Sequence, residues 1–143
     1  MSILRPFLNV AKGIYTKMLP AERNHIVFTS FSGHYSDSPK ALSEAIHALR
    51  PSIKITWLVS PERMADLPDY VDGVDINSFS AAIAKGKAGI IIDNVYGDKS
   101  VALESEKWRA VLKYRFRVWM RCKKRQHVYT TWHGTPLKRM GRD

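Results

Sequence analysis

The sequence lacks the features that define several protein classes. Among its 143 residues there is a single cysteine, Cys122, so neither a disulfide framework nor a cysteine-based zinc site is expected. Arg5, Pro6, Lys12 and Lys17 interrupt the apolar residues near the N-terminus, so no hydrophobic run there reaches the length of a signal core or a membrane span. The histidines show no metal-ligand spacing such as HxxxH. We therefore expect a cytoplasmic protein without a metal site.

Acidic residues are scarce in the last third of the chain. Positions 1–100 carry 11 Lys and Arg against 10 Asp and Glu, whereas positions 101–143 carry 12 against 3, which places +9 of the net charge of +10 there. This asymmetry indicates an anionic partner, either a phosphorylated substrate, anionic lipid or nucleic acid. The length and the 45% hydrophobic content predict one folded domain with a sizeable core.

Short apolar segments alternate with helical patterns along the chain. Segments rich in β-branched and aromatic residues, bounded by turn residues, indicate buried strands at 25–31, 54–60, 74–78, 88–94 and 127–133. Helical periodicity fills the intervals at 38–49, 79–85 and 101–125. This alternation implies βαβ units. We predict an α/β, Rossmann-like parallel sheet with flanking helices over residues 21–143, after an amphipathic segment over residues 1–20.

Two glycine loops are expected to meet at one edge of this sheet, because ligands and loops gather beyond the carboxyl ends of parallel strands. Each loop, at 31–39 and at 132–136, runs from a strand through a glycine and small polar residues to a proline and a helix start. The free N–H groups of a helix start suit an anion. The candidate substrate-binding residues in these loops are Ser32, Gly33, His34, Asp37, Gly134 and Thr135.

Charged and titratable side chains at this edge each have a functional and a structural interpretation. His133 is either a general base, since imidazole titrates near neutral pH, or a histidine that packs at a strand end. Asp93 and Asn94 end the most buried strand and either orient substrate, hold His133 in one tautomer, or form a cap or turn. Lys138 and Arg139 oppose the dipole of the helix that they begin, which indicates a bound anion or a solvated surface.

The stretch 107–125 combines nine cations with four aromatic residues. Three interpretations are open: a helix that packs one face on the sheet, a basic amphipathic helix at an anionic membrane surface, or a grip on single-stranded nucleic acid. Nothing beyond the charge supports nucleic acid, which is therefore not an expected partner. The candidate membrane-surface residues are Trp119, Arg121, Lys123, Lys124 and Arg125.

Three segments resemble motifs of a known family: Tyr129–Gly141 (YTTWHGTPLKRMG), Phe28–Leu42 (FTSFSGHYSDSPKAL) and Ile91–Asn94 (IIDN). The first is similar to the hallmark motif of the CDP-glycerol glycerophosphotransferase family, the teichoic acid primases and polymerases. The other two are similar to that family's first strand and loop and to its motif after the fourth strand. The resemblance spans roughly residues 20–143, which would be the first half of the family's catalytic region.

The resemblance implies a two-domain, GT-B-like enzyme at the inner face of the cell membrane, with this chain as its N-terminal, acceptor-side domain. Members move glycerol phosphate from CDP-glycerol to a hydroxyl of a lipid-linked wall-polymer precursor and release CMP, without a cofactor. The resemblance gives His133 the role of the base for the acceptor hydroxyl and leaves the donor to the second domain. Ribitol phosphate enzymes share the motif, so the transferred unit stays open.

Because the sequence stops two residues after Gly141, at the start of a helix, we expect a truncated, partial transferase with negligible activity alone. A separate donor-binding domain is then an expected partner, together with the lipid-linked precursor and an anionic membrane surface. The alternative is a non-catalytic fragment that binds a membrane or another protein through the basic stretch.

Overall fold

The computed structural model describes residues 11, 13–94 and 126–131 of the 143-residue chain. Within them the elements follow the order β1, η1, α2, β2, η2, β3, α3, β4 and β5, where η marks a short 3-10 helix. Residues 13–18, which precede β1, are also helical. In this described part of the chain, no helix is both long enough and apolar enough to cross a membrane.

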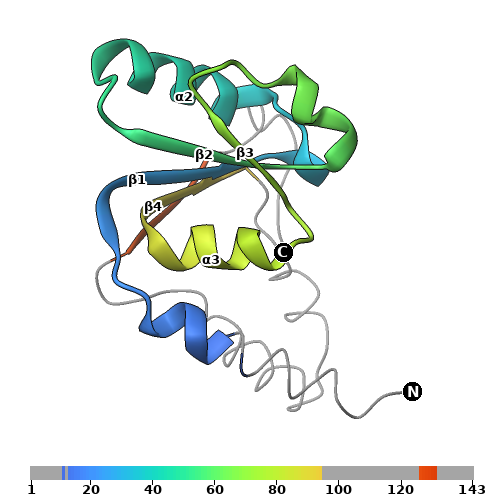
Figure 1. Cartoon of the computed structure of the whole chain (residues 1–143). Helices are drawn as coiled ribbons and strands as arrows, with labels where there is room; N and C mark the ends of the chain where they lie inside the picture. Colours follow the sequence, from blue (N-terminus) through green and yellow to red (C-terminus); the bar gives the residue numbers. More distant parts are fainter. Residues whose placement is uncertain (1–10, 12, 95–125, 132–143) are drawn as a thin grey trace, which may run out of the picture.

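The strands form one parallel sheet in the order β3-β2-β1-β4-β5 (Figure 1). Their bounds are Glu22–Thr29 for β1, Lys54–Val59 for β2, Asp72–Asp75 for β3, Ala88–Asp93 for β4 and His127–Thr130 for β5. The chain moves outward from β1 to β3 and then returns to the other side of β1 with β4. In such sheets the loops after β1 and β4 diverge, and ligands bind in the crevice between them. The predicted Rossmann-like α/β fold is confirmed.

Helices cover both faces of the sheet. Helix α2 (Asp37–Leu49) lies on one face and α3 (Phe79–Lys87) on the other (Figure 1). The short helices η1 (Phe31–Gly33) and η2 (Pro61–Asp66) follow β1 and β2. Helical residues 13–18 pack on α3, since a Cβ added to Gly86 would lie 2.8 Å from the Thr16 carbonyl oxygen.

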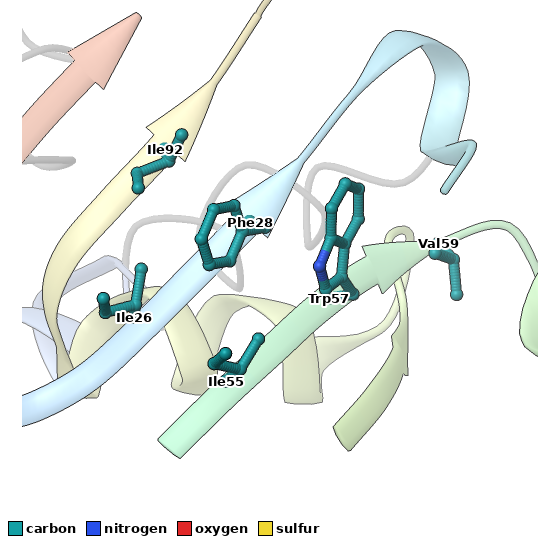
Figure 2. Close-up of a cluster of buried hydrophobic side chains, with 6 residues drawn as sticks. All are labelled: Ile26, Phe28, Ile55, Trp57, Val59 and Ile92. Carbon is teal, nitrogen blue, oxygen red and sulfur yellow. The ribbon is translucent and has the colours of Figure 1, made fainter. Parts of the chain in front are cut away.

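The core has two layers because successive side chains of a strand point to opposite faces. Six side chains from β1, β2 and β4 form the layer under α2 (Figure 2): Ile26, Phe28, Ile55, Trp57, Val59 and Ile92. On the other face, Ala81 of α3 packs on Val27, Leu58, Ala88 and Ile91 of the strands. Strands that are buried on both faces explain the continuous apolar runs in the sequence.

All five predicted strands are present within the described residues, with shifted bounds. Strand β1 begins at Glu22 and ends at Thr29, because the residues after Ser30 turn into η1. Strand β3 occupies residues 72–75 instead of 74–78, because Asp75 accepts the Asn77 N–H at 2.9 Å and its carbonyl accepts the Ser78 hydroxyl at 2.7 Å, which forms a turn. The predicted helices at 38–49 and 79–85 are confirmed as α2 and α3, each slightly longer. The predicted helix at 101–125 and positions 132–133 lie outside the described residues.

His25 is a buried histidine near the amino-terminal ends of the strands, far from their carboxyl ends. Its Nε2 lies 2.9 Å from the Thr56 hydroxyl and its Nδ1 lies 3.6 Å from the Glu22 carboxylate. Burial, reinforced by the nearby charge of Lys54, lowers the pKa of His25 below its ordinary value of 6.5. Glu22 and Asp72 oppose this shift, and Lys87 adds to it.

The lowered pKa of His25 predicts that the protein loses stability in mild acid. The unfolded chain binds a proton near pH 6.5, whereas folded His25 stays neutral to lower pH, so the free energy of unfolding falls as the pH drops below about 6.5. Urea unfolding at pH 7.5 and pH 5.5 measures this difference. His25→Gln should flatten the dependence, while His34→Gln, in an exposed loop, should leave it in place. A slope that survives His25→Gln would assign the acid sensitivity to another group.

Candidate functional site

Three polar residues lie directly after the last paired residues of neighbouring strands. Ser30 follows β1, Asn94 follows β4 and Thr131 follows β5. The Thr131 N–H donates to the Asp93 carbonyl oxygen at 2.7 Å, so the parallel pairing of β4 and β5 continues one residue past the strands. By the alternation of side chains, all three belong to the face of the sheet that α2 covers. They form a row, which we call the strand-end row.

The strand-end row is polar, and two of its three residues are buried. Ser30 and Asn94 are only 3% and 2% exposed. The side-chain oxygens of Asn94 (Oδ1) and Thr131 (Oγ1) are buried without a hydrogen-bond partner in the described structure. A buried polar atom without a partner costs about 1–3 kcal/mol, so native proteins tolerate few of them. The row therefore has hydrogen-bonding capacity that the described fold does not use.

A hydrogen bond joins this row to the start of α2. The Asn94 side-chain amide (Nδ2) donates to the Asp37 carboxylate (Oδ2) at 3.1 Å, across 57 positions of sequence. Asp37 is exposed and has a φ of 63°, the left-handed region that non-glycine residues seldom adopt. The contact bridges the loop after β1 and the residue after β4, so it lies at the point where the strand order reverses.

A second, longer contact ties the helix start to β1. Ser36 precedes α2, and its hydroxyl lies 3.4 Å from the hydroxyl of Ser30. Ser36 makes no side-chain hydrogen bond that caps the helix. Pro39 is buried in the first turn of α2, where its missing N–H is tolerated. Proline is thus the third residue of this helix, which begins at Asp37.

Gly33 holds the loop between β1 and α2 against the sheet. Its carbonyl oxygen accepts the Ser60 N–H at 2.9 Å, and its φ is 76°. A Cβ at this position would lie 2.6 Å from the Ser60 nitrogen. Only glycine has both the conformation and the room that this approach requires. The positive φ and the close approach to Ser60 therefore explain why position 33 is a glycine, independently of any ligand.

Tyr35 also anchors this loop, through contacts of its ring and its hydroxyl group. Its ring meets Trp57 edge-on, with 4.7 Å between centroids, and its hydroxyl lies 3.4 Å from that of Tyr70. Burial, together with the hydrogen bond to Tyr70, raises the pKa of the Tyr35 phenol above its ordinary value of 10. Lys40 lies 5.2 Å from the Tyr35 ring centroid and 4.0 Å from the Glu44 carboxylate. The Lys40 ammonium group therefore lies near both the Tyr35 ring and the Glu44 carboxylate.

Of the candidate residues predicted from sequence, the structure brings Asp37 and Asn94 into direct contact. Asp93 is the last residue of β4, His34 is exposed in the loop, and Ser32 contributes to η1. Ser30, although expected at this edge, and Thr131 were not among the predicted site residues; the rule that ligands bind past strand ends would have selected both had the ends been known. In the described part of the chain, no three His, Cys, Asp or Glu residues form a group that could hold a metal ion.

Several candidates lie outside the described residues, and their positions stay predictions. They are the proposed base and its motif, and the basic residues assigned to anions or to the membrane: His133, Gly134, Thr135, Lys138, Arg139, Trp119, Arg121, Lys123, Lys124 and Arg125. His133 follows Thr131, the last member of the strand-end row, by two positions.

Comparison with known proteins identifies the relatives of this domain. Residues 14–143 match the family described as CDP-Glycerol:Poly(glycerophosphate) glycerophosphotransferase. The chain belongs to this family. Two teichoic acid poly(glycerol phosphate) polymerases are similar to it, one from Staphylococcus epidermidis (29% identical over 119 residues) and one from Bacillus subtilis strain 168 (27% over 127 residues). The matches cover 82% and 87% of this chain but only 14% of each polymerase.

Solved structures of the wall teichoic acid polymerase TagF share the fold of this glycerophosphotransferase family member. A histidine-to-asparagine variant of TagF soaked with CDPG superimposes with a TM-score of 0.68 and 26% identity, over 96% of this chain and 32% of the TagF chain. TagF without a named variant gives a TM-score of 0.65 at 24% identity. The parallel sheet with flanking helices is therefore the fold of a region of a GT-B type enzyme.

Proposed function

We propose that this chain forms the acceptor-side part of a transferase that moves glycerol phosphate from CDP-glycerol to a lipid-linked teichoic acid precursor. Membership of the glycerophosphotransferase family gives the reaction class. The observation that supports the acceptor-side role is the strand-end row of Ser30, Asn94 and Thr131, which lies where this fold binds ligands and offers hydrogen bonds to a hydroxyl-rich molecule.

In the proposed reaction, an acceptor hydroxyl oxygen attacks the phosphorus that carries glycerol in CDP-glycerol. The new O–P bond forms while the bond from that phosphorus to the CMP oxygen breaks, and CMP leaves. His133 accepts the proton of the attacking hydroxyl, as a neutral imidazole near pH 7 can do. Catalysis consists of positioning and of stabilising charge on the transferred phosphoryl group.

The proposal divides the substrates between two parts of a larger enzyme. This chain holds the acceptor, and a donor-binding domain of the kind expected from the family holds CDP-glycerol. The chain works at the inner face of the cell membrane, where a lipid-linked acceptor resides. The exposed apolar side chains of Ile14 (51%), Tyr15 (50%) and Met18 (79%) on helical residues 13–18 favour a position next to a membrane or another protein surface.

The test compares the two ligands on the full chain. Glycerophosphoglycerol, a soluble analogue of the acceptor polymer, should bind with a dissociation constant of about 1 mM, a typical weak affinity. In ¹H–¹⁵N NMR spectra it should shift the signals of Asn94 and Thr131. CDP-glycerol at the same concentration should shift neither, and CMP serves as the control for its nucleotide. Preferential binding of CDP-glycerol, or no binding of glycerophosphoglycerol, would overturn the acceptor-side assignment.

A further inference from the structure

Sequence patterns suggested that both helix starts at this edge bind phosphate, but the start of α2 carries its own negative charge. Asp37 is the first residue of α2 and places a carboxylate beside the free N–H groups of the first turn. A carboxylate there already satisfies the helix dipole and repels a phosphate. Lys40, the nearest cation of that turn, is directed to Glu44 and the Tyr35 ring. The start of α2 is therefore poorly suited to an anion.

The Asp37 carboxylate is held in place by a residue with an unfavourable backbone conformation. Its backbone adopts a φ of 63°, where a non-glycine residue is disfavoured even though aspartate tolerates it better than most. Its partner Asn94 is 2% exposed and donates its amide to Asp37, while its own Oδ1 stays buried without a partner in the described structure. Strained backbone and unsatisfied polar atoms that occur together are typical of functional sites.

The chemistry of these groups suits a ligand that carries hydroxyl groups. An ionised carboxylate only accepts hydrogen bonds, and one Asp37 oxygen already accepts the Asn94 amide. The exposed carboxylate can therefore take a donor such as an alcohol O–H. The hydroxyl of Thr131, buried without a partner among the described residues, lies in the same strand-end row and either donates or accepts. Together they match an uncharged polyol segment of a ligand.

We infer that Asp37 recognises a hydroxyl group of the acceptor polyol and that Asn94 is the positioning residue that holds the Asp37 carboxylate for it. This inference rests on the proposed acceptor-side function. It gives the start of α2 a task different from phosphate binding: the carboxylate accepts the hydroxyl hydrogen and keeps phosphodiester groups of the polymer away from this point.

Two probes of equal charge test the inference. Glycerophosphoglycerol and dipropyl phosphate are both phosphodiesters with one negative charge, but only the first has hydroxyl groups. The full chain should bind glycerophosphoglycerol at least tenfold more tightly, because a site built to hydrogen-bond a hydroxyl rejects an analogue without it. Equal affinity for the two probes would overturn hydroxyl recognition.

Substitutions then assign the preference to Asp37. Asp37→Asn should weaken glycerophosphoglycerol binding about tenfold, in line with hydrogen bonds to charged groups, and leave dipropyl phosphate binding unchanged or slightly tighter. Asp37→Gly should do the same and keeps the fold, since glycine accepts a positive φ. Asp66→Asn is the matched control, an exposed carboxylate on η2 that pairs with Arg63 at 3.4 Å. An unchanged preference in both Asp37 variants would overturn the inference.

A double-mutant cycle separates positioning from a general structural role of Asn94. Asn94→Ala should reduce the preference for glycerophosphoglycerol in the wild-type background and have no further effect on it in Asp37→Asn. A purely structural role would weaken both probes equally and would persist in the double variant, which would contradict the positioning role. If the wild-type chain binds neither probe, the proposed function fails as well. If it binds glycerophosphoglycerol and the Asp37 variants bind it equally, this inference alone fails.

Discussion

Replacing Trp57 with alanine is expected to lower the free energy of unfolding by about 3–5 kcal/mol, the range for large aromatic residues in a core. Trp57 is fully buried in the centre of β2. Its ring stacks on Phe28 with 5.5 Å between centroids and meets Tyr35 edge-on at 4.7 Å (Figure 2 shows Trp57 and Phe28). Removal of the indole leaves a cavity under α2 that rigid neighbouring strands cannot fill.

A conservative variant separates the loss of volume from the loss of a polar group. The Trp57 Nε1 is a buried donor without an acceptor in the described structure. Trp57→Phe removes this unpaired donor, a gain of about 1–3 kcal/mol, which offsets part of the cost of the smaller ring. We therefore expect Trp57→Phe to be much less damaging than Trp57→Ala in urea unfolding. Equal losses in the two variants would mean that the indole N–H has a partner.

Trp57 also connects stability with the candidate site. Tyr35, which contacts its ring, lies in the loop between η1 and α2, two residues before Asp37. The core side chain and the site loop thus share one aromatic contact. A core variant that lowers stability should also loosen the loop, so ligand-binding measurements on Trp57 variants need a parallel measurement of the folded fraction.

The architecture was predictable because its signals are local. Apolar strands buried on both faces, such as Ile90–Ile92, and the helical spacing of Ala41, Leu42, Ala45, Ile46 and Leu49 each occupy a short window of sequence. Alternating elements then imply a parallel sheet. The strand order and the position of the switch point between β1 and β4 follow from tertiary packing, which no single window contains.

The details of the site were less predictable, because they depend on exact strand ends and on long-range contacts. The sequence pattern extended the first strand to Phe31, which placed Ser30 inside a strand, whereas β1 ends at Thr29 and leaves Ser30 in the strand-end row. Asp37 and Asn94 were both candidates, but their hydrogen bond spans 57 positions. Nothing in the loop sequence predicts that Asp37, rather than a glycine, has a left-handed backbone.

The relatives of this chain are much longer than the chain itself. The chain spans 14% of the polymerases it matches and 32% of the TagF chains whose fold it shares. A switch-point crevice usually takes its ligand from the loops on both sides of the reversal. The loop after β1 and the start of α2 supply a carboxylate, a glycine turn and a tyrosine anchor. That composition supports the hydroxyl recognition proposed for Asp37.

Gly33→Ala is expected to lower the free energy of unfolding by about 2–4 kcal/mol, because two separate costs add at this position. The left-handed φ of 76° costs an L-residue roughly 1–2 kcal/mol. The new Cβ would also lie 2.6 Å from the Ser60 nitrogen and 3.0 Å from the Val59 carbonyl carbon, and both neighbours are backbone atoms of the sheet edge that cannot give way cheaply. Urea unfolding measures the loss.

Gly73→Ala is the matched control, because its conflict is with flexible side chains. A Cβ there would meet the tips of Leu67 and Met64, at 2.5 and 3.0 Å, and the backbone of Gly73 does not need a positive φ. These side chains can rotate away, so the loss should be clearly smaller than for Gly33→Ala. If the two variants were equally destabilised, the Gly33 loop would not be fixed on the backbone of β2. Because this loop leads directly to Asp37 at the start of α2, Gly33→Ala should also abolish the preference for glycerophosphoglycerol even where the variant stays folded.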